Sequence, residues 1–130
     1  MIVVDASAMV EALVGRDPDA ELLGVLAGDL AAPHLLDVEV LSALRGLVLG
    51  EKLAAEAAEH AVRDHFAFDI ARLEVSPLAA RVWGLRHRYS SYDACYLALA
   101  EALDAPLYTC DARLVGPGHE ARVEVVQPTR

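Results

Sequence analysis

Apolar positions follow two different periods along the chain, and the changes of period divide it into strands and helices. Short apolar or β-branched runs typical of strands occur at residues 2–5, 30–33, 68–75, 105–110 and 122–126. Helical spacing of apolar residues covers residues 6–14, 17–27, 36–49, 51–65, 76–88 and 92–103. Because strands separated by helices imply right-handed crossovers, the pattern predicts a three-layer α/β/α sandwich with a short, largely parallel sheet.

Helix boundaries are marked by capping residues. Asp17 followed by Pro18 indicates the start of the second helix, and Gly50 indicates the end of the third. Ser90 stands three residues before Asp93, which is the spacing of a capped helix start. We therefore expect Glu39 and Asp93 each to lie in the first turn of a helix.

The size and composition of the chain fit one folded domain over residues 1–130. The 130 residues are 55% hydrophobic, which is enough for one core. Charged residues interrupt every apolar stretch well before the roughly 20 residues of a membrane-spanning helix. No basic region precedes the first apolar run, so a secretory signal is not expected. We expect a cytoplasmic protein without a membrane segment.

The charge balance restricts the kind of partner. With 20 acidic against 11 basic residues, the net charge is -9, which argues against binding nucleic acid by bulk positive charge. A polyanionic substrate would need local arginines or bound cations.

Four acids are predicted to meet at one edge of the sheet. Asp5 and Asp111 follow the first and fourth strands, and the carboxyl ends of parallel strands share one edge. The crossover helices begin at that same edge, which adds Glu39 and Asp93. Each acid taken alone also has a structural explanation as a cap or a first-turn acid. Together, crowded carboxylates repel one another unless a cation neutralises them, and oxygen ligands suit Mg²⁺ or Mn²⁺.

Several neighbours of these acids have two readings. Ser7 and Thr109 are either capping hydroxyls or groups that orient a carboxylate or a metal-bound water. Arg113 and Arg45 are either contacts to the phosphates of a polyanionic substrate or solvated side chains. The five histidines form no metal-binding pair, and we expect them at the surface or at caps: His34, His60, His65, His87 and His119.

Four segments in this order resemble the PIN-domain nucleases and, within them, the VapC toxin ribonucleases. They are IVVDASAMVEAL, DVEVLSALRGL, SSYDACYLALAEALDAPLYTCDARL and VEVVQP, which span nearly the whole chain. Some relatives carry a further acid shortly after the last aspartate, whereas here Ala112 and Arg113 follow, which leaves a fifth ligand without support.

The resemblance implies a magnesium- or manganese-dependent endoribonuclease that acts as the toxin of a toxin–antitoxin pair. Its catalytic and metal-binding residues would be Asp5, Glu39, Asp93 and Asp111. It also implies an RNA substrate, a small antitoxin protein as partner and a homodimer.

Two other functions are compatible with parts of the pattern. A phosphotransfer or phosphatase domain would use Asp5, but such domains need a lysine near the phosphate, and the only lysine is Lys52, at the start of a helix. A non-catalytic PIN-like binding module would have an incomplete set of acids, whereas all four are present.

Overall fold

A computed structural model describes residues 1–129, and Arg130 lies outside the described residues. The order of elements confirms the predicted alternation of strands and helices. The strands are β1 (Ile2–Val4), β2 (Leu30–Pro33), β3 (Ile70–Leu73), β4 (Leu107–Thr109) and β5 (Val123–Val125). The helices are α1 (Ala6–Val14), α2 (Ala20–Leu26), α3 (Leu35–Leu49), α4 (Ala55–Ala67), α5 (Ala79–Gly84) and α6 (Ser91–Leu103), with short 3₁₀ turns η1 (Ser76–Leu78) and η2 (Ala112–Leu114).

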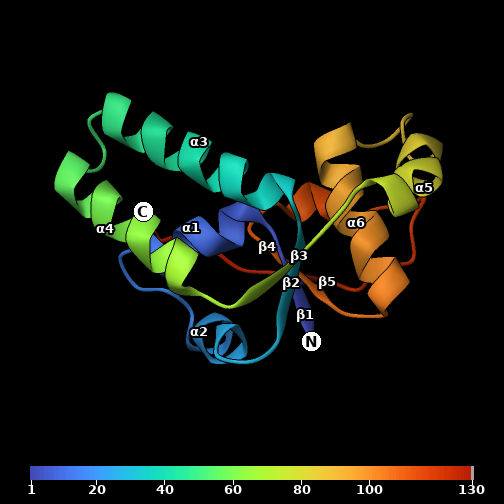
Figure 1. The fold of residues 1–130 in the computed structure, drawn as a ribbon, viewed down its shortest axis with the longest axis horizontal. Coiled ribbons are helices and arrows are strands. Elements are labelled where there is room, and N and C mark those ends of the chain that lie inside the picture. The colour runs from blue at the N-terminus through green and yellow to red at the C-terminus, as the bar shows by residue number, and fades with distance from the viewer. Residues whose placement is uncertain (130) are drawn as a thin grey trace.

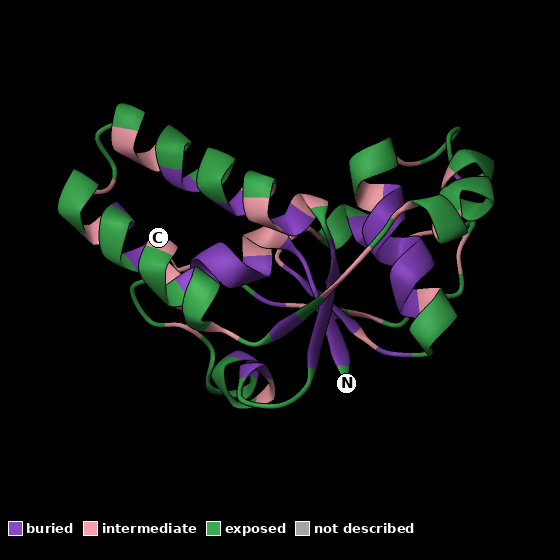
Figure 2. Ribbon diagram, in the orientation of Figure 1, coloured by how far each residue is buried: buried purple, intermediate pink, exposed green. Residues whose placement is uncertain are grey.

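The sheet is parallel throughout, with the strand order β3-β2-β1-β4-β5. Figure 1 shows α1, α3 and α4 on one side of the strands and α5 and α6 on the other, which is the predicted three-layer sandwich. All three residues of β1 are buried, as expected for a central strand covered on both faces (Figure 2). The first strand therefore lies at the centre of the sheet, and the residue that follows it, Asp5, lies at the edge where the carboxyl ends of the strands meet.

Of the two helices α5 and α6, which cover the same face of the sheet, α6 is the more deeply buried. Its residues from Ala94 to Ala100 are all buried, and the Ser90 hydroxyl accepts a hydrogen bond from the Asp93 N–H at 3.1 Å. Capping and burial together fix where this helix begins, and so they fix the position of Asp93.

Several predicted boundaries were wrong, each for a local reason. The second helix begins at Ala20 because Asp19, not Asp17, is its N-cap and accepts from the N–H groups of Glu21 and Leu22. The fourth helix begins at Ala55 rather than residue 51, because Glu51 has φ of 58° and belongs to a turn. The segment at 76–88 is a 3₁₀ turn followed by the short α5, not one long helix.

The third helix begins at Leu35, which changes the expected place of Glu39. The acid in its first turn is Asp37, and Glu39 lies two residues further along. Within residues 1–129, no helix combines the length and the apolar character needed to cross a bilayer.

The end of the chain is attached to α1 by a buried carboxyl group. Glu11 is fully buried, and its two oxygens accept hydrogen bonds from the backbone N–H and the hydroxyl of Thr129. The Thr129 hydroxyl also accepts from the N–H of Asp17 at 3.0 Å, and its carbonyl accepts from the N–H of Arg16 at 3.2 Å. Thr129 thus provides hydrogen-bond partners both for the buried Glu11 carboxyl group and for the backbone N–H groups of Arg16 and Asp17, which follow α1.

We expect Thr129→Val to lower the free energy of unfolding by about 1–3 kcal/mol, because it removes a donor from a buried carboxyl group while keeping the side-chain shape. Urea denaturation measures the change. Gln127→Ala, at an exposed position two residues earlier, is the control and should stay within about 0.5 kcal/mol of wild type. Equal losses in the two variants would show that the Glu11 contact contributes nothing specific.

Candidate active site

Asp5 is the buried centre of the carboxyl edge. It follows β1 directly, serves as the N-cap of α1, and is only 8% exposed. Its Oδ1 accepts hydrogen bonds from the Ser7 hydroxyl at 2.7 Å and the Ala8 N–H at 3.0 Å, and its Oδ2 accepts from the Thr109 hydroxyl at 2.5 Å. Burial raises the pKa of Asp5, although these hydrogen bonds act in the opposite direction.

Ser7 and Thr109 hold Asp5 from both sides. The Ser7 hydroxyl also accepts from the N–H of Cys110 at 2.8 Å, and the Thr109 hydroxyl accepts from the N–H of Asp111 at 3.0 Å. Each hydroxyl therefore donates a hydrogen bond to Asp5 and accepts one from a backbone N–H in the segment after β4. This arrangement fixes the Asp5 carboxyl and connects it to the segment that carries Asp111.

Glu39 and Asp93 approach Asp5 from helices on opposite faces of the sheet. Burial raises the pKa of both, and the negative charges of Asp5 and Asp93 raise that of Glu39 further. Repulsion from Asp111 adds to the increase at Asp93. Asp93 thus interacts electrostatically with Asp5, Glu39 and Asp111, and Asp5 also interacts with Glu39.

Asp111 differs from the other three acids because it forms an ion pair with an arginine, Arg113. Its carboxylate accepts three hydrogen bonds from the Arg113 guanidinium, two from Nε at 3.0 and 3.2 Å and one from Nη2 at 2.6 Å. These bonds lower the pKa of Asp111. The Arg113 side chain is 83% exposed, so it can leave the carboxylate at little cost.

Arg45 lies elsewhere. It lines an apolar groove of about 270 Å³ between α3 and α4, and none of the four acids lines that groove. The structure therefore brings Arg113 to the acids and does not bring Arg45 to them.

Tyr96 is a site neighbour that sequence reasoning missed. Its hydroxyl donates to Glu39 Oε1 at 2.6 Å, and the ring is 2% exposed. Burial, followed by the contact with Glu39, raises the pKa of Tyr96 far above its usual value, so the phenol remains a donor. The available signal was its spacing of three residues from Asp93, which places both on one face of α6.

A second polar cluster was also missed. His65 is fully buried, so the expectation of surface histidines was wrong for this one. Its Nε2 lies 2.8 Å from Asp37 Oδ1, and Arg72 Nε donates to Asp37 Oδ2 at 2.8 Å. Burial alone would raise the pKa of Asp37, but the hydrogen bonds from Arg72 and His65 lower it. The cluster ties the start of α3 to α4 and β3, and so it fixes the helix turn before Glu39.

The acids suit a divalent cation by type and charge, but their side chains are not arranged as a closed ligand set. Within residues 1–129, no three His, Cys, Asp or Glu side chains are grouped closely enough to hold a metal ion as they stand. Arg113 engages Asp111, and Tyr96 engages one oxygen of Glu39. Three carboxyl groups with raised pKa values would nevertheless be stabilised in their charged form by a cation, so the residues fit such an ion.

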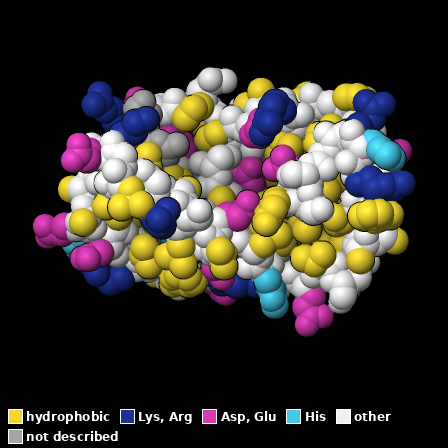
Figure 3. Space-filling view, turned by 90° about the horizontal axis from the view of Figure 1, so that it is seen from above, with side chains coloured by type: hydrophobic (Ala, Val, Ile, Leu, Met, Phe, Trp, Pro, Cys, Tyr) yellow, Lys and Arg dark blue, Asp and Glu magenta, His cyan; other side chains and the backbone are white. Residues whose placement is uncertain are grey.

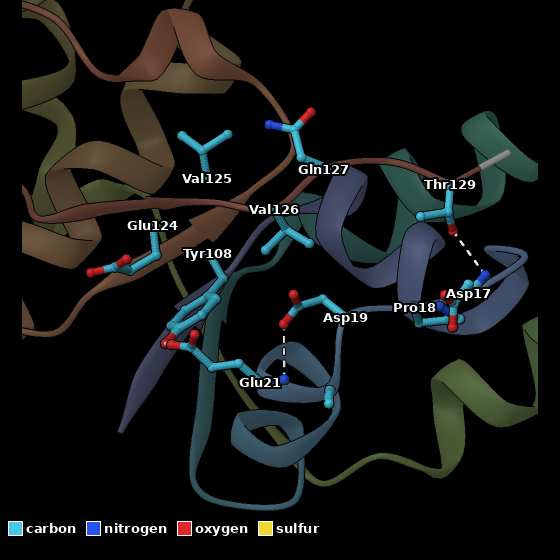
Figure 4. Close-up of a pocket in the computed structure, with 11 residues that line it drawn as sticks. Asp17, Pro18, Asp19, Glu21, Tyr108, Glu124, Val125, Val126, Gln127 and Thr129 are labelled. Carbon is cyan, nitrogen blue, oxygen red and sulfur yellow. Dashed lines mark hydrogen bonds between the residues drawn. The ribbon is translucent and has the colours of Figure 1, made fainter.

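Figure 3 looks onto the molecule from above the carboxyl edge and shows acidic side chains around a hollow near the middle of the face. A cavity of about 500 Å³ lies near the start of α2, and none of the four acids lines it (Figure 4). Two of its acids already have structural partners, since Asp19 caps α2 and Glu21 accepts from the Tyr108 hydroxyl at 3.2 Å. We therefore assign the candidate site to the carboxyl edge.

Comparisons with known proteins agree with this assignment. A sequence model of the PIN domain matches residues 2–117. The chain is 45% identical over 130 residues to Ribonuclease VapC1 of Mycobacterium tuberculosis, covering 96% of this chain and 97% of that protein. The structure of PAE2754 from Pyrobaculum aerophilum aligns with a TM-score of 0.72 at 25% identity, over 94% of this chain and 82% of the other. A toxin-antitoxin complex from Klebsiella pneumoniae aligns with a TM-score of 0.61 at 18% identity, over 90% and 92%, which shows likeness of fold.

Divalent cations should stabilise the folded protein, because they relieve the repulsion among the four acids. At about 100 times its dissociation constant, Mn²⁺ should raise the melting temperature by roughly 5–15 °C, and Mg²⁺ by less. The Asp5→Asn/Asp93→Asn double variant is the comparison and should respond much less in a thermal melt. The same increase in both proteins would mean that the ions bind elsewhere.

Proposed function

Because the chain belongs to the PIN-domain family, we propose that it is the ribonuclease toxin of a toxin–antitoxin pair and that it hydrolyses RNA phosphodiester bonds at the carboxyl edge. One observation carries the proposal. Repulsion between neighbouring carboxyl groups connects Asp111 to Asp93, and Asp93 to Glu39 and the buried Asp5, although these acids come from separate elements. Asp5, Glu39, Asp93 and Asp111 are the catalytic residues in this proposal.

Ribonucleases of this family are generally metal-dependent, and we propose Mg²⁺ or Mn²⁺ as the ion, held by the same four acids. The all-oxygen donor set supports this choice over zinc. A divalent ion held there would supply a bound water of lowered pKa and positive charge to offset that on the leaving oxygen. The protein's own contribution is to keep Asp5 in one orientation through Ser7 and Thr109.

Arg113 is proposed to contact RNA. In the structure its guanidinium pairs with Asp111, and an RNA phosphate offers it the same paired acceptor geometry. If the Arg113 guanidinium moved from Asp111 to an RNA phosphate, the Asp111 carboxylate would become free when the substrate binds. For Arg45, whose place in the α3–α4 groove is away from the acids, contact with RNA stays a prediction.

No observation favours the two alternative functions. Lys52, which a phosphotransfer domain would need near its phosphate, lies in the turn between α3 and α4, at the end of those helices that is far from the sheet (Figure 1). A binding module without catalysis would not need a carboxyl group as buried as that of Asp5.

We also propose a small antitoxin as partner. The Klebsiella pneumoniae relative of this fold is a toxin-antitoxin complex, and the net charge of -9 favours a basic partner. The groove between α3 and α4 is lined almost entirely by apolar side chains and suits the apolar face of a partner helix. Homodimer formation stays a prediction that light scattering of the purified chain tests.

Asp93→Asn should lower metal-dependent cleavage of cellular RNA by roughly 100-fold or more, about 2.7 kcal/mol of transition-state stabilisation. Asp5→Asn should act similarly. The matched control is Asp104→Asn, at the other end of α6, where the side chain is 95% exposed and asparagine tolerates the φ of 48°. Full cleavage by Asp93→Asn, with an unchanged far-UV spectrum, would refute the proposed site.

Inhibition by the antitoxin should weaken as Mn²⁺ concentration rises. A guanidinium can bridge two carboxylates, and Arg113 already shows that a guanidinium pairs with one acid of this site, so a partner arginine would compete with the cation. Cleavage by the purified complex, measured across a metal titration, tests this, and binding is followed in parallel. Replacing the antitoxin arginine that lies among the carboxylates should restore part of the cleavage activity without releasing the antitoxin. Metal-independent inhibition that survives every such replacement would leave steric blocking as the mechanism.

A further inference from the structure

Tyr96 forms a direct bond between the two helices that approach Asp5 from opposite faces of the sheet. It lies on α6 with a 2% exposed ring, and its hydroxyl donates to Oε1 of Glu39, which belongs to α3, at 2.6 Å. Figure 1 shows α3 and α6 on the two sides of the strands, so this bond crosses the carboxyl edge. It is a partly buried link between two of the elements that carry proposed metal ligands.

The bond restricts the Glu39 side chain, which would otherwise rotate about several bonds. Glutamate loses rotamer freedom when it binds a ligand, and a fixed donor on one oxygen removes part of that freedom in advance. The bond engages Oε1 and not Oε2. The Tyr96 ring is itself immobile, because the residues of α6 around it are buried.

We propose that Tyr96 is a positioning residue that orients Glu39 for cation binding and thereby couples the α6 end of the site to α3. This inference rests on the proposed function, because it assigns Glu39 to the metal site. Asp93 precedes Tyr96 by three residues on the same helix, so one rigid element carries a proposed ligand and the group that orients another.

The chain supplies a matched control. Tyr108 is also buried, at 7% exposure, and its hydroxyl also donates to a glutamate, Glu21 Oε1, at 3.2 Å. That pair lies in the cavity near the start of α2, which none of the four proposed ligands lines. Tyr108→Phe thus removes the same kind of bond outside the site.

The test is Mn²⁺ binding to the full chain without RNA, measured by titration calorimetry and by the electron paramagnetic resonance signal of free Mn²⁺. Tyr96→Phe should weaken binding by about three- to tenfold, since a hydrogen bond to a charged group is lost. Tyr108→Phe should leave binding unchanged. In a Glu39→Ala background, Tyr96→Phe should have no further effect, because a residue that acts through Glu39 cannot act without it.

The outcomes separate this inference from the proposed function. If wild type binds Mn²⁺ in an Asp5-dependent way and Tyr96→Phe binds equally well, only the positioning role is wrong. Equal weakening by Tyr96→Phe with and without Glu39 would also overturn it and would mean a general packing effect. If wild type takes up no Mn²⁺ at this edge, the metal-dependent function and the role of Tyr96 are both wrong.

Discussion

The arrangement of the site depends on one constraint, which is the burial of the Asp5 carboxyl at the end of the central strand. A carboxyl group that is 8% exposed must be hydrogen-bonded, because an unpaired buried polar group is costly. Ser7, Ala8 and Thr109 supply those bonds, and the two hydroxyls also bind the backbone after β4. Satisfying Asp5 therefore joins β1, α1 and β4 into one frame at the edge where the other acids arrive.

The same arrangement places carboxyl groups where burial and mutual repulsion disfavour their charged forms. Asp5, Glu39 and Asp93 all have pKa values raised by burial, with repulsion from neighbouring carboxylates added. Arg113 relieves Asp111, and Tyr96 donates to Glu39, so the chain itself neutralises part of the edge. Asp5 accepts hydrogen bonds from the neutral groups of Ser7, Ala8 and Thr109, and the positive charge of Arg113 offsets only part of the increase in the pKa of Asp93. Under the proposed function, this repulsion is a cost in stability that a bound cation would remove.

Pattern and spacing predicted much of this from the sequence. Apolar runs separated by helical segments were sufficient for the parallel sandwich, because both periods are local properties of the chain. The convergence of Asp5, Glu39, Asp93 and Asp111 followed from the geometry of a parallel sheet. The start of the second helix was missed because Asp17 and Asp19 are both plausible caps. In the structure Asp19 caps the helix, and the N–H of Asp17 donates instead to Thr129, far along the chain.

Other features depend on pairings between distant positions, which no local pattern reveals. His65 looked like a surface residue on a polar helix, yet it is buried against Asp37, 28 residues away. The partner of the buried Glu11 is Thr129, 118 residues away. The Tyr96–Glu39 bond likewise joins two helices that are separated by a strand and two further helices in the sequence.

The most direct measurement is the anomalous scattering of Mn²⁺ in crystals of the protein grown with that ion. The account predicts a peak at the carboxyl edge, about 2.0–2.3 Å from carboxylate oxygens of Asp5 and at least one of Glu39, Asp93 and Asp111. A peak among the acids of the cavity near the start of α2 instead, or no peak at either place, would contradict it.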